Sequence, residues 1–326
     1  MSYKTLSFSF LLACTTLTLS SCQKSKISSD ETTVMTETYV HKYGVPLSEQ
    51  SWKDRGENGE IVTLQKNGVT LTKTFKNGVL DGPLTHSFPF SDLIELTELY
   101  EKGSLTSQVW NYQNGTPKEK KLYQKNKKTI YSSWYQSGSP RTHEVFESDW
   151  LMTGDYYTAD NSLESNIKNG QGTRIIRDGN GKLLAKENVE SGLRKQKTTY
   201  FENGDPETVM TYLNGLEDGQ KKVFGHGGIP VRIEEWSQGK QHGITTLFQN
   251  GQMQAELSYL NGKLEGLEKR YRHGNLLVEE IMWKNNERNG PSHSYINGKK
   301  ISYWYHNGKQ VSEKIYQELS KDTSTE

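Results

Sequence analysis

The sequence contains few cysteines, few apolar residues and almost no net charge, and each of these properties excludes some classes of protein. The 326 residues include only two cysteines, so at most one internal disulfide can form. The formal net charge is +1, which excludes a strongly basic nucleic-acid-binding protein. Apolar residues make up only 32% of the chain, whereas tyrosine (18) and tryptophan (7) are plentiful. This composition favours a thin structure over one with a thick core.

Long apolar runs are absent except at the N-terminus. Lys4 precedes an apolar segment of about 15 residues that ends near Leu19. The segment is too short and too rich in serine and threonine to span a membrane, and no second apolar segment follows. We therefore predict that residues 1–21 are a signal peptide.

The end of this segment resembles a bacterial lipobox. Leu19, Ser20 and Ser21 supply the aliphatic and small residues that signal peptidase recognises, and Cys22 is the predicted site of lipidation. The alternative is a plain signal peptide in which Cys22 merely follows the cleavage site. Cleavage before Cys22 leaves a single cysteine, so the mature chain then has no internal disulfide. Gln23 resembles the residue that directs enterobacterial lipoproteins to the outer membrane.

The rest of the chain divides by composition into three parts. Residues 22–50 are mostly polar and are predicted to be a flexible tether, in which a strand is expected only around Tyr39. Residues 51–316 are predicted to be a repeat array, and residues 317–326 a polar tail. The expected location is the bacterial cell envelope, with the N-terminal lipid as the contact with the membrane.

Residues 200–298 repeat one short phrase, an aromatic residue followed two or three positions later by Asn-Gly or a similar pair. Successive first-phrase glycines are 23, 24, 23 and 24 residues apart: Gly204, Gly227, Gly251, Gly274 and Gly298. A second phrase lies between each pair, and a third glycine follows it by four residues: Gly219, Gly243, Gly266 and Gly290. A fixed period of this length is typical of a repeat protein whose units stack on their neighbours.

The repeats predict tandem β-hairpins. The chain contains thirteen Asn-Gly pairs, and Asn-Gly is the pair that best tolerates the positive φ of a two-residue hairpin turn. Between turns the residues alternate, as in Met253, Ala255, Leu257 and Tyr259, which are expected on one face. The predicted fold is therefore all-β, a single elongated and twisted antiparallel sheet of hairpins of about 23 residues.

The repeat aromatics are expected to form a ladder on one face of this sheet, with Lys, Glu, Gln and Thr on the other. The predicted ladder residues are Tyr212, Phe224, Trp236, Phe248, Tyr259, Tyr271, Trp283 and Tyr295. Their rings either hold the sheet together, which the apolar alternation favours, or form an exposed strip that binds a glycan, an acyl chain or a partner strand.

This pattern resembles the bacterial variant of the MORN repeat. The resemblance covers most of residues 60–310; it is strong from 181 to 308 and irregular at 83–114 and 146–180, where glycines are missing. It implies strings of β-hairpins that serve as interaction surfaces, with proposed links to membranes. Bacterial proteins that resemble it are often labelled as antitoxin components of toxin–antitoxin systems.

Several possible sites are better explained as parts of the repeat. Residues 225–228 (Gly-His-Gly-Gly) resemble an oxyanion loop, but no G-x-S-x-G motif accompanies them and they fall at a turn. His226 and His273 lie two repeats apart, too far to share a metal ion, and His242 and His306 follow the same pattern. Recurrent strand glutamates are expected on a solvated or lysine-paired face: Glu256, Glu279 and Glu280. We therefore predict no catalytic residues, no metal and no cofactor.

The leading hypothesis is an exported, lipid-anchored, non-catalytic scaffold that presents a long surface to an unidentified protein partner or to the cell envelope, without nucleic acid. The alternative is an antitoxin or immunity protein that neutralises a toxin by binding it. Lipidation of Cys22 distinguishes these hypotheses, because a toxin-neutralising protein of the cytosol needs no lipid.

Overall fold

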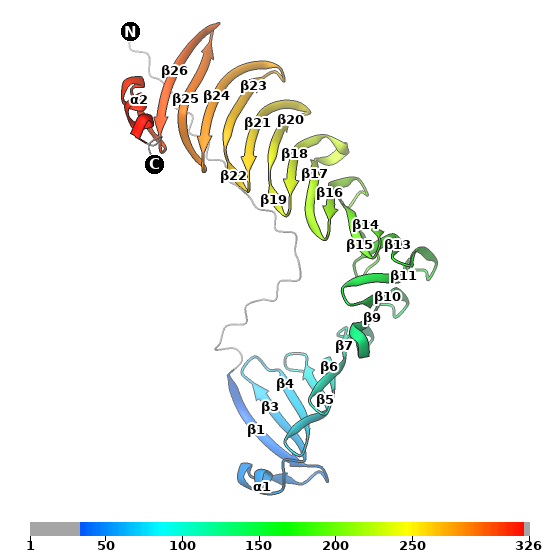
Figure 1. The fold of residues 1–326 in the computed structure, drawn as a ribbon. Coiled ribbons are helices and arrows are strands. Elements are labelled where there is room, and N and C mark those ends of the chain that lie inside the picture. The colour runs from blue at the N-terminus through cyan, green and yellow to red at the C-terminus, as the bar shows by residue number, and fades with distance from the viewer. Residues whose placement is uncertain (1–32, 323–326) are drawn as a thin grey trace.

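The computed structural model describes residues 33–322, and in this range the chain forms one antiparallel sheet that curves into an open crescent (Figure 1). The sheet has 27 strands, and almost every strand pairs with the strands next to it in sequence. This confirms the predicted elongated single sheet of hairpins. The predicted signal peptide and Cys22 lie outside the described residues.

The elements follow one another without long loops. The first arm of the crescent comprises β1 (Val34–His41), β2 (Pro46–Leu47), α1 (Glu49–Asp54), β3 (Gly59–Gln65), β4 (Thr70–Lys76), β5 (Val79–Ser87), β6 (Ile94–Glu101), β7 (Ser104–Asn111) and β8 (Pro117–Gln124). The middle comprises the 3-10 turn η1 (Lys125–Lys127), β9 (Lys128–Trp134), β10 (Pro140–Glu147), β11 (Trp150–Tyr157), β12 (Leu163–Lys168), β13 (Gln171–Arg177), β14 (Leu183–Glu190) and β15 (Leu193–Tyr200).

The second arm comprises β16 (Pro206–Leu213), β17 (Leu216–Phe224), the 3-10 turn η2 (His226–Gly228), β18 (Pro230–Ser237), β19 (Lys240–Gln241), β20 (Gly243–Gln249), β21 (Gln252–Leu260), β22 (Lys263–Leu264), β23 (Gly266–Arg272), β24 (Leu276–Lys284), β25 (Glu287–Ile296), β26 (Lys299–His306), β27 (Lys309–Val311) and α2 (Glu313–Asp322). No helix in the described range is long and apolar enough to cross a membrane.

The second-phrase turns have the backbone that Asn-Gly was expected to supply. Asn214 and Gly215 have φ values of 51° and 83°, and Asn261 and Gly262 have 51° and 83°. Two successive positive φ angles define the hairpin turn whose twist matches the flanking strands. His273 also has a positive φ (53°) and lies in a turn, as a histidine before glycine at this position predicts, whereas His242 lies between β19 and β20 and is not a turn residue.

The turns of one edge are also bonded to one another. The N–H of Gly239 donates to the carbonyl of Glu217 (2.8 Å), and the N–H of Gly262 donates to that of Gln241 (2.8 Å). A similar bond joins Gly308 to Arg288 (2.9 Å). Because turns alternate between the two edges of a hairpin meander, this edge collects every second-phrase turn.

The aromatic ladder was predicted on one face, and this prediction is wrong. Phe248 pairs with Met253, whereas Leu247 pairs with Ala255, so a β-bulge inserts one residue into β21. Since side chains alternate along a strand, the extra residue moves Ala255 and Tyr259 to the face opposite Phe248 and Met253. The same kind of register shift recurs in the neighbouring hairpins.

The eight ladder residues therefore form two rows. The second-phrase aromatics lie on one face: Tyr212, Trp236, Tyr259 and Trp283. The first-phrase aromatics lie on the other: Phe224, Phe248, Tyr271 and Tyr295. All eight are half-buried, so neither row is a fully exposed strip.

The predicted tether is partly wrong, because its second half belongs to the sheet. β1 pairs with β3 along Thr36–Glu37 and onward to His41, and α1 follows with Ser48 as its N-cap. Trp52 of α1 is only 3% exposed and packs against the rings of Tyr39 and Phe75. A polar strand is difficult to predict from sequence, because its own residues do not favour a strand and its order comes from pairing with a partner strand.

The predicted polar tail begins inside a helix. α2 follows the last strand, and Tyr316 packs against Trp304, with 5.1 Å between ring centroids. The irregular stretches 83–114 and 146–180 also form strands of the same sheet. Thus missing glycines in these copies did not interrupt the array.

Residues 146–180 instead build the corner of the crescent, where β10 to β13 lie in Figure 1. β12 and β13 pair through only two residue pairs, so this hairpin is short. A small apolar cluster fills the corner: Leu151, Tyr156, Ile167, Ile175 and Val189, with Phe146 and Leu183 packed against it. The copies that depart most from the repeat thus supply the apolar cluster at the bend.

Candidate functional site

One face of the sheet buries a row of carboxylates, and we call it the glutamate face. Glu144, Glu187, Glu234 and Glu268 are between 1% and 5% exposed. The second-phrase aromatics lie on this face, with the buried Met210 and Ile281. A buried carboxylate is stable only when charged or polar donors surround it, so each of these residues must have specific partners.

In the second arm the partners are tryptophan and arginine. Trp283 donates from Nε1 to Glu268 (2.7 Å), and Arg270 donates from Nε to the same carboxylate (2.6 Å). Trp236 also donates from Nε1 to a buried carboxylate, that of Glu234 on its own strand (2.8 Å). These bonds explain why tryptophan, with its N–H, fits this row.

Basic side chains lie over the rings of the glutamate face. Lys221 lies 5.4 Å from the Trp236 ring centroid, and Arg288 lies between the rings of Trp283 (5.8 Å) and Tyr305 (5.4 Å). Such contacts are attractive, and they also occupy ring surface that a ligand would need. This geometry supports the interpretation that the row holds the sheet together.

The opposite face carries a tyrosine–glutamate row. Tyr271 donates its hydroxyl to Glu256, and Tyr295 donates to Glu280, both at 2.7 Å. Burial and the bond to Glu256 raise the pKa of Tyr271 to about 12. We expected solvated or lysine-paired glutamates here, and this was wrong for Glu256 and Glu280. Glu279 lies on the glutamate face and pairs with Arg270 (3.0 Å).

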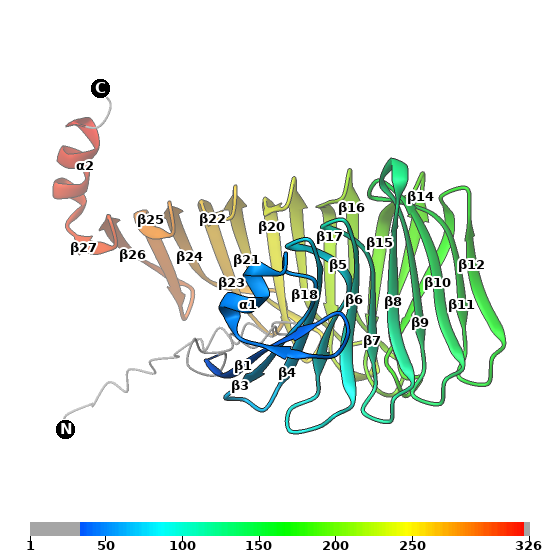
Figure 2. The same ribbon diagram turned by 90° about the horizontal axis from the view of Figure 1, so that it is seen from below.

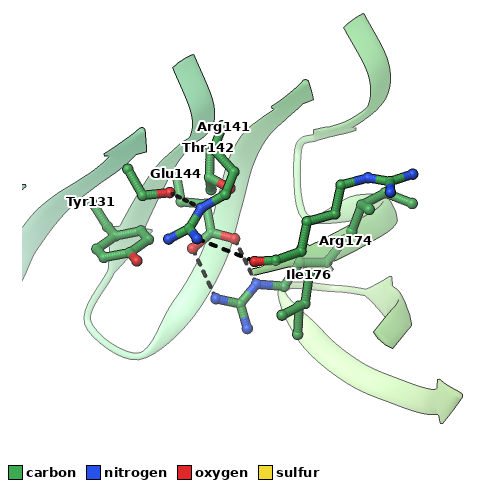
Figure 3. Close-up of a pocket in the computed structure, with 9 residues that line it drawn as sticks. Tyr131, Arg141, Thr142, Glu144, Arg174 and Ile176 are labelled. Atoms are coloured by element: carbon green, nitrogen blue, oxygen red, sulfur yellow. Dashed lines mark hydrogen bonds and ion pairs between the residues drawn. The ribbon is translucent and has the colours of Figure 1, made fainter. Parts of the chain in front are cut away.

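At the corner, Arg174 of β13 contacts Glu144 of β10 (Figure 3) and also Glu187 of β14. It donates from Nε and Nη2 to Glu144 (2.6 and 2.9 Å) and from Nη1 to Glu187 (3.2 Å). Tyr156 donates to Glu144 (2.8 Å), and Arg194 donates to Glu187 (2.9 Å). The bidentate contact between Arg174 and Glu144 is the geometry that arginine makes best with a carboxylate.

These contacts show that the glutamate face is the inner face of the bend. Glu144 lies on β10 and Arg174 on β13, three strands apart, which in a flat sheet is about 14 Å. A direct contact across that span requires the sheet to fold toward this face. Gly154 on β11 lies opposite Glu144 and leaves room beneath the contact.

The network shifts the pKa values of its members. Burial alone would lower the pKa of Arg174, but the bonds and charges of Glu144 and Glu187 outweigh burial and raise it. Burial would raise the pKa of Glu187, but Arg174, Arg194 and Lys197 together lower it. Burial raises the pKa of Tyr156, and the neighbouring Glu144 raises it further. At neutral pH, therefore, the carboxylate of Glu187 is charged and Tyr156 is neutral.

Two shallow hollows meet at this network. One has a volume of about 100 Å³ and is lined by Ser133, Arg141 and Arg177. The other has a volume of about 460 Å³ and is lined by Lys121 and Tyr123, and the two share Tyr131, Glu144 and Arg174. The arginines and Glu144 of these hollows are already in ion pairs within the protein, and Lys121 lies over the ring of Trp110, so the hollows suit a docked polar group better than acid–base catalysis.

The second candidate site is an edge of the sheet. The turns of the second-phrase edge carry nine exposed lysines, and we call this edge the lysine edge: Lys76, Lys102, Lys125, Lys127, Lys168, Lys240, Lys263, Lys284 and Lys309. None of these lysines forms an ion pair within residues 33–322. Five carboxylates belong to the turns of this edge: Glu101, Glu147, Asp149, Glu190 and Glu287. Asp218 and Glu265 also reach it, where they accept hydrogen bonds from the backbone N–H groups of Gln238 (3.1 Å) and Asn285 (2.8 Å).

The lysine edge is most clearly basic in the second arm. Lys240, Lys263, Lys284 and Lys309 occupy successive turns, with Glu287 as the one carboxylate of those turns. Leu213 (51% exposed), Leu216 (52%) and Leu260 (47%) protrude beside them. In Figure 2 this edge is the upper rim, where β22 and β27 lie. Successive turns on one edge are two strands, or about 10 Å, apart.

The opposite edge has no such excess. Its turns carry five carboxylates, Asp92, Asp160, Asp178, Glu202 and Asp205, alongside basic residues such as Lys182, which pairs with Glu202. Sequence analysis missed the lysine edge because it compared all turns together. Separating alternate turns would have shown lysine recurring at one set of positions.

The histidines and the glycine-rich loop keep structural positions. His226 lies in the η2 turn and packs against Phe201, with ring centroids 4.4 Å apart. His306 lies beside Tyr316 of α2. Residues 33–322 contain no group of three side chains arranged to hold a metal ion. Residues 225–228 form the turn between β17 and β18, as predicted.

Comparison with known proteins does not identify the chain. It matches no known protein family, and no curated protein matches it. One solved structure that resembles it is "TcdB2-TccC3-TEV", at 10% identity over 84% of this chain and 21% of that chain, with a TM-score of 0.17. Others are Sqt1 of Saccharomyces cerevisiae (10% identity, 77% and 84% covered, TM-score 0.15) and a porin-like protein from Bacteroides uniformis (10%, 78% and 89%, 0.15). Similarity this weak carries no functional argument.

Proposed function

We propose that the protein is an exported, lipid-anchored, non-catalytic scaffold whose lysine edge lies against an anionic surface of the cell envelope. The observation that carries the proposal is the lysine edge, in which lysines without ion pairs recur at successive turns of the second arm and exposed leucines flank two turns of the same edge. The lipobox-like residues around Cys22 add a covalent anchor. In this proposal the acyl chains on Cys22 hold the protein at the membrane, and the basic edge sets its orientation there.

In this proposal the two faces have different roles. The lysine edge orients the crescent on the envelope, since each lysine near an anionic lipid surface contributes about 1 kcal/mol. The inner face at the corner remains open to a protein partner, with its hollows beside Glu144 and Arg174. Nearly all bonding capacity of the ion network is used internally, which supports a binding role without catalysis.

Vesicle binding tests the lysine edge. The chain with Cys22 replaced by serine is mixed with vesicles of phosphatidylcholine alone or with 30% phosphatidylglycerol (about the anionic fraction that gives a substantial surface potential). We expect cosedimentation only with the anionic vesicles, and a loss of binding as salt rises. Equal binding to both vesicles would contradict the proposal.

Two variants that remove the same number of lysines distinguish the effect of the lysine edge from the effect of net charge. The triple variant Lys240→Gln/Lys263→Gln/Lys284→Gln should weaken binding on the order of 100-fold, from about 1 kcal/mol per lysine. The control variant Lys222→Gln/Lys299→Gln/Lys314→Gln removes the same charge from exposed positions off the edge. If both variants weaken binding equally, net charge and not the lysine edge drives the interaction.

A further inference from the structure

Both ends of the sheet leave a strand edge open. β1 pairs with β3 on one side, and on its other side with β2 at Tyr39 and Val40 alone. β26 pairs with β25 on one side, and on its other side with β27 from Trp304 to His306 alone. Within the described chain, residues 34–38 and 299–303 therefore keep one edge without strand partners, and all ten residues are exposed.

The two open edges match in length and in position. Each is a run of five residues in a strand of eight, followed by three half-buried residues, of which a short strand pairs with two in β1 and with three in β26. An open edge presents backbone N–H and C=O groups ready to pair with another chain. Figure 1 shows β1 and β26 at opposite tips of the crescent, so the two edges of one molecule do not meet each other.

We propose that β26 of one copy pairs antiparallel with β1 of a second copy, so that the sheet continues from molecule to molecule. Aligning the two five-residue edges places Lys300 opposite Glu37, and Ile301 opposite Thr36. The same alignment places Ser302 opposite Met35. The assembly is head-to-tail, and it forms a ring or a filament depending on whether the rotation closes.

Charge selects this pairing over the two symmetric ones. β26 paired with itself about Ile301 would set Lys300 opposite Ser302 and Lys299 opposite Tyr303, with no carboxylate on either strand segment. β1 paired with itself about Thr36 would set Glu37 opposite Met35, with no base on either strand segment. Only the mixed pairing sets opposite charges against each other, and directly opposed charges of unlike sign stabilise a strand pair. Lys299 and Lys300 therefore disfavour pairing of β26 with a second β26, and they favour its pairing with β1.

The terminal helices do not obstruct this pairing. α2 contacts the far end of β26 through Tyr316 on Trp304 and His306, beyond residue 303. α1 contacts the far end of β1 through Trp52 on Tyr39, beyond residue 38. In an antiparallel pair these two ends point in opposite directions, so each helix lies outside the paired segment.

Cysteine crosslinking tests the register. In a full-length background with Cys14 and Cys22 replaced by serine, Met35→Cys and Ser302→Cys proteins are oxidised separately and as a mixture. We expect disulfide-linked dimers in the mixture and none in either protein alone. Two control variants report the symmetric pairings: Thr36→Cys alone crosslinks if β1 pairs with itself, and Ile301→Cys alone if β26 does. Crosslinking of either control, or none in the mixture, would overturn the proposal.

Charge-reversal variants test the contribution of the Lys300–Glu37 pair to self-association without introducing cysteines. Lys300→Glu and Glu37→Lys should each weaken self-association about fivefold in sedimentation equilibrium, and the double variant should restore it. Circular dichroism checks that each variant is folded. A chain that stays monomeric at every concentration, or a double variant weaker than both singles, would overturn the proposal. Because β1 and β26 both end at the lysine edge, the antiparallel pairing inverts successive copies, and the assembly is proposed for the protein in solution. These measurements use no vesicles, so their outcome is independent of envelope docking.

Discussion

Gly266 lies directly opposite Trp283 on the neighbouring strand, and the same relationship recurs along the sheet. Gly219 faces Trp236, Gly243 faces Tyr259, and Gly290 faces Tyr305. The third glycine of each repeat is thus paired with a second-phrase aromatic residue, and an aromatic ring covering a strand glycine is a known way to stabilise such a position. The regular spacing of glycines and aromatic residues in the sequence therefore reflects this pairing of a glycine with an aromatic residue on the neighbouring strand.

Replacing Gly266 by alanine should destabilise the protein by about 1–3 kcal/mol, because its φ of 94° is strained for any other residue. The added Cβ would also lie 3.4 Å from the Cβ of Ser258. Urea unfolding measures the change. Gly298→Ala is the matched control for positive φ in open space, since nothing lies within 4 Å of its added Cβ. If the two variants are equally destabilised, backbone strain alone explains the glycine and the close contact with Ser258 contributes nothing.

Removing the guanidinium of Arg174 should destabilise the corner strongly. Arg174→Ala leaves Glu144 (1% exposed) and Glu187 (3%) without their shared partner, and breaking a buried pair in this way costs about 3–5 kcal/mol. Arg174→Lys keeps the charge but loses the bidentate contact, so a smaller loss is expected. Thermal unfolding of both variants tests this ordering. An alanine variant as stable as the wild type would show that the network contributes no stability.

Acid should destabilise the protein through Glu187. Its pKa is lowered in the folded state, so its contribution to stability is complete above the unfolded pKa of about 4.3 and is lost as pH falls toward the folded value. We expect the unfolding free energy of the wild type to decline below about pH 4.5 more steeply than that of Glu187→Gln. Parallel slopes for the two proteins would show that other carboxylates control the acid transition.

Removing the Glu268 carboxylate should lower the stability of the second arm and change the environment of the Trp283 ring. Glu268→Ala removes the acceptor of the Trp283 N–H and the partner of Arg270, and leaving a buried donor unpaired costs about 1–3 kcal/mol. The fluorescence of Trp283 should change in the same variant. Glu287→Ala, an exposed carboxylate at the next turn, is the control and should leave both unchanged. Equal effects of the two substitutions would contradict a specific role for the buried carboxylate.

Much of the fold could be predicted from the sequence because turn preference is local. Asn-Gly pairs require positive φ, and their spacing fixes the hairpin length, so the single antiparallel sheet followed directly. The bulge at Met253 could not be predicted, because it depends on the register between two strands. One inserted residue was enough to place Tyr259 and Phe248 on opposite faces.

Other features depended on contacts between residues far apart in the sequence. The Arg174–Glu144 pair spans 30 residues and exists only because the sheet bends at a degenerate repeat. The strand β1 is polar and gains its order from β3 and from Trp52. The lysine edge was within reach of the sequence, since Lys240, Lys263 and Lys284 recur with the repeat once alternate turns are separated.

The most direct test of the proposed function is lipid labelling at Cys22. Cells that express the full chain are fed an alkyne analogue of palmitate, and the protein is captured from the membrane and soluble fractions. We expect labelled protein in the membrane fraction, and unlabelled protein from the Cys22→Ser variant. Cys14→Ser is the matched control and should be labelled normally. A wild-type protein that is unlabelled and cytosolic would contradict the lipid-anchored scaffold.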